Sequence, residues 1–482
     1  MIDFRPVGYI LGRLLALFGA SMALPMVVDL THGNGNAHAF AISMTVTVTV
    51  GCLVGIACSE RRRRDLDLRQ GFLLTVATWM SFTAFAALPF LLGAPHLGLT
   101  DAIFESTSAM TATGATVIAG LDSLPHGVLL WRCLVTWIGG IGVVLLAIIM
   151  LPVLGIGGMQ LLRNSDFNTL GKVMPKAKEI AFSIASVYLT LTLACALGYV
   201  WGGLSGFDAL THAMSTVATG GMANHDSSFI GFSPAAQYVA IVFMLLGGMS
   251  FVRFVQLGAG DPRPLLRDSQ IHAFLAIYLT LCLGLVLARI DNGERIDETA
   301  LREILFSMAS VITTTGFANA DYGAWGPLAT TLFFCAMMVC GCSGSTSGGP
   351  KVFRYQLLTS AVAVEVHRLY SPTAVTLPRY EGRTITPEVM NSVMAFFMLF
   401  FLTLGIGAIA LVLLGLDPVT AISGSAAALT NVGPGFGPHI GPVGNYAVLS
   451  DEAIWVTIIL MFVGRLELLT VYVLFTATYW RG

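Results

Sequence analysis

The chain is dominated by apolar runs of roughly 20 residues separated by short polar segments. A helix of that length matches the ~30 Å hydrocarbon core of a bilayer. Most of the runs lack the charged outer face that a large soluble helical protein would need. The pattern therefore predicts an all-α membrane protein with ten spanning segments, at residues 9–29, 41–58, 72–93, 128–152, 180–202, 234–257, 270–290, 325–358, 390–416 and 450–478.

Basic residues gather in every second connection between these segments. The alternate connections, such as 94–99 and 203–206, carry few of them. By the positive-inside rule the basic connections are cytoplasmic, and ten spans then place both termini on that side. A second interpretation of the first basic cluster, as a site for anionic lipid, stays open. The basic residues are Arg61 to Arg64, then Arg163, Lys172, Lys176 and Lys178, then Arg263 and Arg267, and finally Arg368, Arg379 and Arg383.

The N-terminal segment has some features of a signal peptide. Arg5 and Arg13 precede an apolar run, and Ala37-His38-Ala39 resembles a cleavage site. Signal peptides span about 15–30 residues, so cleavage here would come late. A second apolar run follows at once. We therefore expect residues 1–70 to form a retained transmembrane hairpin.

Composition narrows the function further. Apolar residues make up 55% of the chain and charged residues 11%, against about 25% charged in soluble proteins. The formal net charge is −2 and no basic stripe is present, so no nucleic-acid partner is expected. The spacing Cys340-x-Cys342 lacks a second pair, which argues against a metal site.

The connections expected outside the membrane contain a fourfold repeat. Leu99 to Gly114 and Leu301 to Gly316 align without a gap, and each begins as a short helical stretch and ends in a Thr/Gly motif. Phe207 to Gly220 follows the same pattern, and the fourth copy ends at Ala428 to Gly433. The copies are roughly a hundred residues apart, which is too long for a solenoid repeat. The expected repeats are 71–178, 179–268, 269–388 and 389–482.

The repeated turn has a chemical purpose if its four copies surround one axis. A chain that turns inside the membrane leaves backbone carbonyls unpaired, which is tolerated only in protein or beside a watery pore. A dehydrated cation can accept such carbonyls as ligands. Glycine permits the positive φ that turns them inward. Ca²⁺ and Mg²⁺ favour carboxylate ligands, and no ring of Asp or Glu flanks the four glycines. The alternative, four ordinary helix C-caps, has the same local sequence. The predicted K⁺-binding residues are Thr111, Ala112, Thr113, Gly114, Ala218, Thr219, Gly220, Thr314, Thr315, Gly316, Asn431, Val432 and Gly433.

A Gly/Ser-rich stretch interrupts the eighth segment. Residues 341–350 end in proline and cannot hold a continuous helix. At membrane depth such a break belongs in a water-lined cavity. A phosphate-binding loop is the alternative, but Pro350 separates Gly349 from Lys351 and Val352 replaces the required Ser or Thr.

Several charged residues lie within apolar segments. Arg465 would cost ~3 kcal/mol if it faced lipid, so we expect it to face the pore. Pairing with Glu467 is the alternative, although residues at i and i+2 do not share a helix face. Glu105 is expected to hydrogen-bond the scaffold of the first turn, and Arg132 to reach the outer surface. Asp208 and Asp417 are expected as helix N-caps.

The motifs together resemble the pore subunits of bacterial Trk potassium uptake systems, in the Trk/Ktr/HKT superfamily. The resemblance covers nearly the whole chain. It implies a gated, K⁺-selective and Rb⁺-permeable pore in the bacterial inner membrane. In this superfamily Gly in all four turns goes with K⁺ preference, and Ser in the first turn goes with Na⁺. The supporting motifs are Phe104-Glu105-Ser106, Trp137 to Gly142, Cys342 to Lys351, Arg368 to Pro372, and Asn431 to Gly435.

The resemblance also implies a gate and partners. The family's intramembrane loop below the third turn acts as the gate, together with an arginine of the last span. A homodimer seated on a cytoplasmic ring of TrkA-type subunits, which bind NAD or ATP, is expected. The chain itself would hold K⁺ only as the transported ion. Pro350, Ala112 and Ala218 depart from the family pattern. The implied gate residues are Gly341, Ser343, Gly344, Ser345, Thr346, Ser347, Gly348, Gly349, Lys351 and Arg465.

Two other functions share some of these sequence features. An ion-coupled symporter of the same fold also has broken helices and internal repeats. Such carriers usually bind at the midplane between inverted halves, whereas these repeats share one orientation. A membrane enzyme lacks support, because no His-Glu-x-x-His, Gly-x-Ser-x-Gly or paired acidic motif occurs.

Overall fold

The computed structural model describes residues 3–59, 66–150, 177–373 and 376–481. These residues are almost entirely helical, with one small hairpin in which β1 (Arg379–Tyr380) pairs antiparallel with β2 (Arg383–Thr384). The predicted all-α membrane fold is confirmed. The basic residues Arg61 to Arg64, Arg163, Lys172 and Lys176 lie outside the described residues.

Two helices that pack through glycines begin the chain. The first is α1 (Arg5–Ser21) with its continuation α2 (Ala23–His32), and α3 (Ala37–Ala57) returns beside it. A methyl group on Gly12 would lie 2.4 Å from the backbone nitrogen of Gly55. Small residues allow helices to approach this closely inside a bilayer.

The rest of the chain repeats one order of elements four times: a long helix, a short helix with a turn, and a returning helix. The first copy contains α4 (Leu68–Ala86), α5 (Leu88–Leu92), α6 (Leu99–Met110), η1 (Leu121–Ser123), α7 (His126–Leu145) and η2 (Leu146–Met150). The second contains α11 (Ala177–Trp201), α12 (Gly206–Val217), α13 (Pro234–Gly247), α14 (Phe251–Gly258) and α15 (Arg263–Leu266). The third contains α16 (Ser269–Asp291), α17 (Glu298–Ile312), η4 (Tyr322–Ala324), α18 (Pro327–Val339) and α19 (Val352–Tyr370). The fourth contains α20 (Pro387–Leu413), α21 (Pro418–Thr430), η5 (Tyr446–Val448), α22 (Asp451–Arg465), α23 (Leu468–Val473) and α24 (Ala477–Arg481).

The returning helices of the last three repeats are broken. Within the described residues, seven helices or helix pairs are long and apolar enough to cross a membrane, and α13 with α14 would make eight despite a 95° bend. The interruption expected in 325–358 is present between α18 and α19. The segments predicted to span at 234–257 and 450–478 are each interrupted, the first between α13 and α14 and the second between α22 and α23. Residues with positive φ stand at these breaks: Cys340 directly after α18, Lys351 directly before α19, and Glu467 directly before α23.

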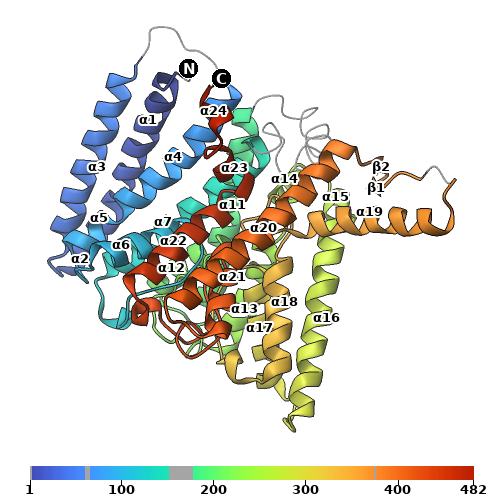
Figure 1. Cartoon of the computed structure of the whole chain (residues 1–482). Helices are drawn as coiled ribbons and strands as arrows, with labels where there is room; N and C mark the ends of the chain where they lie inside the picture. Colours follow the sequence, from blue (N-terminus) through green and yellow to red (C-terminus); the bar gives the residue numbers. More distant parts are fainter. Residues whose placement is uncertain (1–2, 60–65, 151–176, 374–375, 482) are drawn as a thin grey trace.

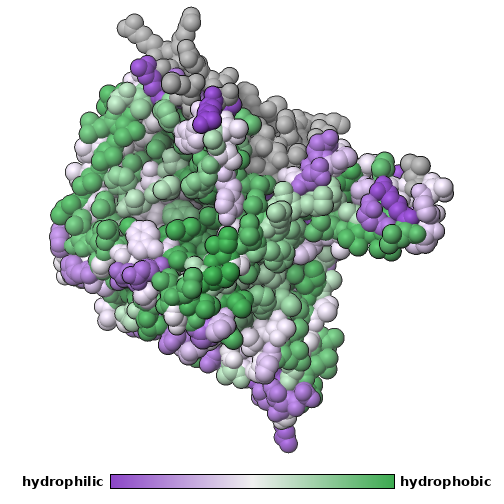
Figure 2. Space-filling model, in the orientation of Figure 1, coloured by the Kyte–Doolittle hydropathy of each residue, from purple (hydrophilic) through white to green (hydrophobic). Residues whose placement is uncertain are grey.

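The outside of the molecule matches a bilayer. Figure 1 shows the two termini close together at one end, and α19 running across the direction of α16. Tyr479 near the C-terminus donates to the carbonyl of Arg69, and Gln70 donates to that of Asp3. Figure 2 shows hydrophobic side chains over most of the visible face, with hydrophilic residues gathered at the lower tip and around the β hairpin.

Local capping explains where the short helices begin. The Asp417 side chain accepts from the backbone N–H of Thr420 and caps α21, as predicted. Asp208 is not the cap of α12, because Ser205 takes that position and accepts from the N–H of Asp208. A side-chain oxygen at this place satisfies an otherwise unpaired N–H of the first turn.

Candidate ion pathway

The four turns that follow α6, α12, α17 and α21 meet in a closed ring. We call them the glycine turns: residues 111–114, 218–221, 313–316 and 430–433. A glycine of each turn lies so close to the next turn that a methyl group on it would overlap a carbonyl oxygen. The pairs are Gly114 with Gly220 (2.7 Å), Gly221 with Thr315 (2.2 Å), Gly316 with Val432 (2.1 Å) and Gly433 with Thr113 (2.5 Å). The tertiary structure therefore brings all four predicted motifs around one axis.

The backbone of each glycine turn alternates in handedness. Two residues with positive φ are separated by one residue, and the second of them is always glycine. The pairs are Ala112 and Gly114, Thr219 and Gly221, Thr314 and Gly316, and Asn431 and Gly433. Such alternation can turn successive carbonyl oxygens to the same side, and glycine adopts it without a Cβ clash.

This alternation corrects the alignment of the second turn by one residue. Gly221, not Gly220, is equivalent to Gly114. The hydrogen bonds agree, since the N–H of Gly220 donates to the carbonyl of Ser215 as that of Thr113 donates to Ser108. The sequence contains a Gly-Gly doublet here, and the Thr-Gly match favoured its first member. The doublet was the signal that could have identified Gly221.

Hydroxyl and amide side chains hold the turns together from behind. The hydroxyls of Thr111 and Thr113 lie 2.7 Å apart, and the equivalent hydroxyls of Thr313 and Thr315 repeat this contact at 2.7 Å. Asn431 donates to the Thr113 hydroxyl at 3.0 Å and so joins the fourth turn to the first. These buried side chains face one another, which leaves the backbone carbonyls as the groups that could face the axis.

Close approach of the returning helices also depends on glycine. A methyl group on Gly139 would lie 2.0 Å from the carbonyl of Met110, and one on Gly464 would lie 1.9 Å from that of Leu429. Met110 and Leu429 are equivalent residues, each two positions before the first left-handed residue of its turn. The first and fourth repeats therefore support their turns in the same way.

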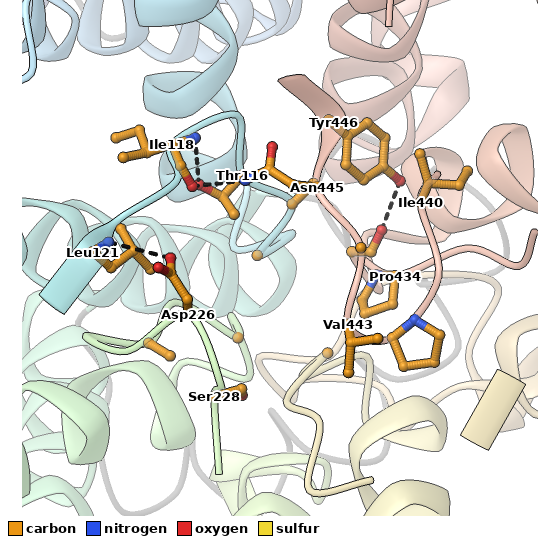
Figure 3. Close-up of a pocket in the computed structure, with 18 of the residues that line it drawn as sticks. Thr116, Ile118, Leu121, Asp226, Ser228, Pro434, Ile440, Val443, Asn445 and Tyr446 are labelled. Carbon is orange, nitrogen blue, oxygen red and sulfur yellow. Dashed lines mark hydrogen bonds between the residues drawn. The ribbon is translucent and has the colours of Figure 1, made fainter. Parts of the chain in front are cut away.

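A cavity of about 230 Å³ lies against one side of the ring. Gly114, Gly221, Gly316 and Gly433 all line it. Figure 3 shows Asp226 and Ser228 of the second repeat on one side and Tyr446 of the fourth on the other. The Tyr446 hydroxyl donates to the carbonyl of Gly433 at 2.8 Å.

Two acidic groups at or near this cavity accept hydrogen bonds from the neighbouring repeat. Asp226 accepts from the backbone N–H groups of Gly120 and Leu121 at 2.9 and 3.2 Å. His225 lies 2.5 Å from the carboxylate of Asp122 at the surface. This hydrogen bond holds the pKa of Asp122 below its usual 3.8. Both contacts tie the outer loop of the first repeat to that of the second.

A buried ion pair supports the first turn. The Arg132 Nε lies 2.7 Å from the Glu105 carboxylate, and their side chains are 1% and 0% exposed. Glu105 also accepts from the Thr116 hydroxyl and the Val117 N–H, just after the glycine turn, which confirms its predicted scaffold role. Arg132 additionally donates to the carbonyl of Ala223 at 2.7 Å. The prediction that Arg132 reaches the outer surface is wrong, because Glu105 offers it a buried counter-charge.

The loop at residues 340–351 lies directly beneath three of the glycine turns. Thr346 donates to the carbonyl of Val217, and its hydroxyl accepts from Thr219, in the second repeat. The N–H of Gly348 donates to the Thr314 hydroxyl at 2.8 Å in the third repeat. A methyl group on Gly348 would lie 2.3 Å from the carbonyl of Thr430 in the fourth. The predicted gate residues are therefore assembled at the turns: Ser343, Ser345, Ser347 and Lys351 are buried, and Gly341, Gly344 and Gly349 belong to the same loop.

Two buried cations lie at this loop, Lys351 at its end and Arg465 beside it. The Lys351 ammonium donates to the carbonyls of Ser345 and Ser347. Arg465 is 3% exposed, and its guanidinium nitrogens have no hydrogen-bond acceptor among the described residues. It lines a small cavity of about 20 Å³ together with Lys351 and Gly348. Arg465 does not pair with Glu467, whose carboxylate instead accepts from Arg354 at 2.7 Å.

The fold and the ring of turns define a class: a polytopic, all-helical membrane protein with four inserted helices that meet on one axis. The family model for TrkH, described as a cation transport protein, matches residues 36–259 and 274–481. The chain belongs to the TrkH family of cation transport proteins, and it is a transporter rather than an enzyme.

Individual relatives match over most or all of the chain. The chain is 43% identical to the Trk system potassium uptake protein TrkI of Halomonas elongata over 414 residues, which cover 86% of this chain and 84% of that protein. It is 37% identical to the Trk system potassium uptake protein TrkH of Vibrio parahaemolyticus over 100% of both. The crystal structure of the potassium transporter TrkH from Vibrio parahaemolyticus matches with a TM-score of 0.91 and 35% identity over 100% of both chains.

Proposed function

We propose that the chain takes up K⁺ across the bacterial cytoplasmic membrane as the transmembrane subunit of a Trk system, through a gated, channel-like pore that also admits Rb⁺. The observation that carries this proposal is the closed ring of four glycine turns. The names of these two relatives, which are potassium uptake proteins, support K⁺ as the transported ion.

Selection would rest on the backbone carbonyls of the glycine turns. The described lining of the cavity beside the ring contains one carboxylate, Asp226, and both of its oxygens already accept backbone N–H groups. Dipolar carbonyl ligands suit a large monovalent cation, whereas Ca²⁺ and Mg²⁺ favour carboxylates. The C-terminal ends of α6, α12, α17 and α21 would add partial negative charge toward the ion. The K⁺ ligands are then the carbonyls of the predicted residues, with Gly221 added in the second turn.

The loop at residues 340–351 would be the gate, and the structure would represent a closed pore. The loop lies beneath the ring and hydrogen-bonds to the second and third turns. Lys351 would hold it in place through the carbonyls of Ser345 and Ser347. Arg465 would place a positive charge in the path of the ion below the ring. A guanidinium stays charged at any relevant pH, so its repulsion of K⁺ would be constant.

Regulation is proposed to come from the cytoplasmic side. A TrkA-type ring that binds NAD or ATP would contact the basic connections, and the chain would function as a homodimer. Both termini would be cytoplasmic, which accords with their position at the same end in Figure 1. α19 follows the loop directly and has the basic residues His367 and Arg368 in its last turn. It would therefore transmit a force from the TrkA-type ring to the gate.

Ion flux in liposomes that contain the purified chain tests the proposal. We expect uptake of K⁺ and Rb⁺ to exceed that of Na⁺ and Li⁺ and to follow an imposed K⁺ potential. Gly114→Ser should raise the Na⁺ to K⁺ permeability ratio. An unchanged ratio would count against the assigned ligands. Uptake that requires a proton gradient even under an imposed K⁺ potential would instead indicate an ion-coupled symporter.

A further inference from the structure

An apolar groove lies between the N-terminal hairpin and the first repeat. Its volume is about 840 Å³, and its walls come from α1, α2, α4, α7 and η2 and the end of α6. Leu17 and Leu24 form part of its rim, and Trp79 and Phe82 part of its wall. The groove is separate from both cavities described above, although Leu146 lines both the groove and the small cavity that contains Lys351 and Arg465.

The groove opens toward the bilayer rather than toward water. Leu17 and Leu24 are 72% and 56% exposed, and α1 with α2, α4 and α7 belong to segments long and apolar enough to span a membrane. The groove is therefore continuous with the surface that bilayer lipid covers. A cavity at this depth fills from the hydrocarbon phase, because water there would lack hydrogen-bond partners.

The chemistry of the lining favours a hydrocarbon chain over a polar ligand. The lining holds no charged side chain, and its polar side chains besides Trp79 are three hydroxyls. Those of Ser21 and Thr75 donate to carbonyls of their own helices, at Phe18 and Gly71. A lipid headgroup or an ion would find no counter-charge here, whereas an acyl chain needs only apolar contact.

Two residues of the groove lie next to the proposed ion pathway. Met110 lines the groove and is the last residue of α6, directly before the first glycine turn. Leu146 lines the groove and also the small cavity that contains Lys351 and Arg465. A molecule in the groove would therefore contact Met110, directly before the first glycine turn, and Leu146, which borders the 340–351 loop.

We propose that this groove binds one acyl chain of a bilayer phospholipid, which packs against Met110 and Leu146 behind the first glycine turn. The acyl chain enters between α1 and α4 and completes the packing between the hairpin and the first repeat. The hairpin then has a role beyond anchoring, because it forms one wall of a lipid site beside the pathway. The binding itself is independent of the proposed function, and only its effect on K⁺ flux rests on that function.

Quenching of Trp79 fluorescence by brominated acyl chains measures occupancy. The full-length protein is placed in bilayers of phosphatidylcholine with or without bromine at mid-chain. The contribution of Trp79 is isolated as the difference between the wild type and Trp79→Phe. We expect strong quenching of this component, because the indole lies in the wall of the groove. No quenching of Trp79 would overturn the proposal and would indicate that a protein segment or a second copy covers the groove.

Two filling variants and one matched control make the result specific. Ala20→Phe extends into the groove from α1, and Gly142→Leu extends toward Trp79, since a methyl group on Gly142 would lie 3.6 Å from its ring. Ala57→Phe adds the same ring to an exposed alanine of α3 outside the groove. Either filling variant should reduce quenching several-fold while Ala57→Phe leaves it unchanged. Equal quenching in a folded filling variant would show that the bromine reaches Trp79 by another route, and would overturn the proposal.

A second readout separates this proposal from the proposed function. K⁺ flux of the wild type should vary with acyl-chain length, and the filling variants should lose that dependence. Quenching that responds to the filling variants, with no K⁺ flux in any protein, would leave the lipid site standing and reject the transport proposal. K⁺ flux with no quenching would support the transport proposal and reject the lipid site.

Discussion

Arg354 at the start of α19 donates from Nη2 to the Glu467 carboxylate at 2.7 Å, across 113 residues of sequence. Their side chains are 0% and 11% exposed. Arg354 also donates to the carbonyl of Pro350 at 3.0 Å, at the end of the 340–351 loop, and stacks on Phe396. Glu467 has a positive φ and stands at the break between α22 and α23. One buried ion pair therefore joins the exit of the proposed gate to the broken last span.

Breaking this pair should open the gate. Glu467→Gln removes the counter-charge of a buried arginine, and such losses cost about 3–5 kcal/mol. We expect higher basal K⁺ flux without any regulatory partner, because the loop end at Pro350 loses its support. Glu365→Gln is the matched control, since Glu365 pairs with Arg368 on the exposed side of the same helix. Flux equal to the wild type in a Glu467→Gln protein of reduced stability would show that the pair is only structural.

The register of the second glycine turn can be tested by rescue. Gly220→Ala would place its methyl 2.1 Å from the Cγ2 atom of Thr136, and Thr136→Ser removes that atom. The double variant should recover most K⁺ flux. Gly221→Ala meets the backbone carbonyl of Thr315 at 2.2 Å, at a positive φ, so no side-chain trimming should rescue it. The proposed register would be contradicted if Gly221→Ala conducted K⁺ normally in liposomes.

Thr346 should hold the loop against the second repeat. Thr346→Val keeps the shape and removes one hydroxyl, which shares its proton between the carbonyls of Val217 and Gly247, each 3.0 Å away, and accepts a second hydrogen bond from Thr219. At about 1 kcal/mol for each bond, basal K⁺ flux should rise several-fold. Thr331→Val on the exposed face of α18 is the control. Deletion of residues 343–347 should raise flux further, and a folded deletion protein with wild-type flux would rule out this loop as the gate.

Arg465→Gln should raise K⁺ flux without loss of stability. A charge ~5 Å from a passing K⁺ would repel it by about 3 kcal/mol at an effective dielectric near 20, and water would reduce this to ~1 kcal/mol. The increase should therefore be several-fold at most, with the K⁺ to Na⁺ selectivity unchanged. Stability should hold because the guanidinium has no acceptor among the described residues to lose. A poorly expressed, unstable Arg465→Gln protein would show instead that the arginine is structural.

The same substitution at Arg132 should have the opposite effect. Arg132→Gln leaves the fully buried Glu105 without its counter-charge, at a cost of about 3–5 kcal/mol. We expect lower thermal stability in detergent and weaker K⁺ over Na⁺ selectivity, because Glu105 also holds the segment after the first turn at Thr116 and Val117. Glu105→Gln together with Arg132→Gln should recover part of the stability. A stable single variant would mean that the ion pair does not support the turn.

The sequence by itself determined the membrane class, the four short helices with their Thr/Gly turns and the break at 341–350. These features are local: each depends on the length of an apolar run or on residues within one turn of backbone. Asp417 was identified as a cap for the same reason, because a cap acts within three residues of itself. Hydropathy did not show the breaks after Gly247 and Arg465, since a broken helix can be as apolar as a continuous one.

Only the tertiary structure decided which residues face one another. Arg132 and Glu105 are 27 residues apart and Arg354 and Glu467 are 113 apart, so neither pair has a local signal. The register of the second turn likewise depends on contact between Gly221 and Thr315 of the next repeat. Burial of a charge is favourable only beside its partner, and a closed ring of backbone forms only when all four turns are present. Both conditions are set by distances in space, which the order of residues along the chain does not contain.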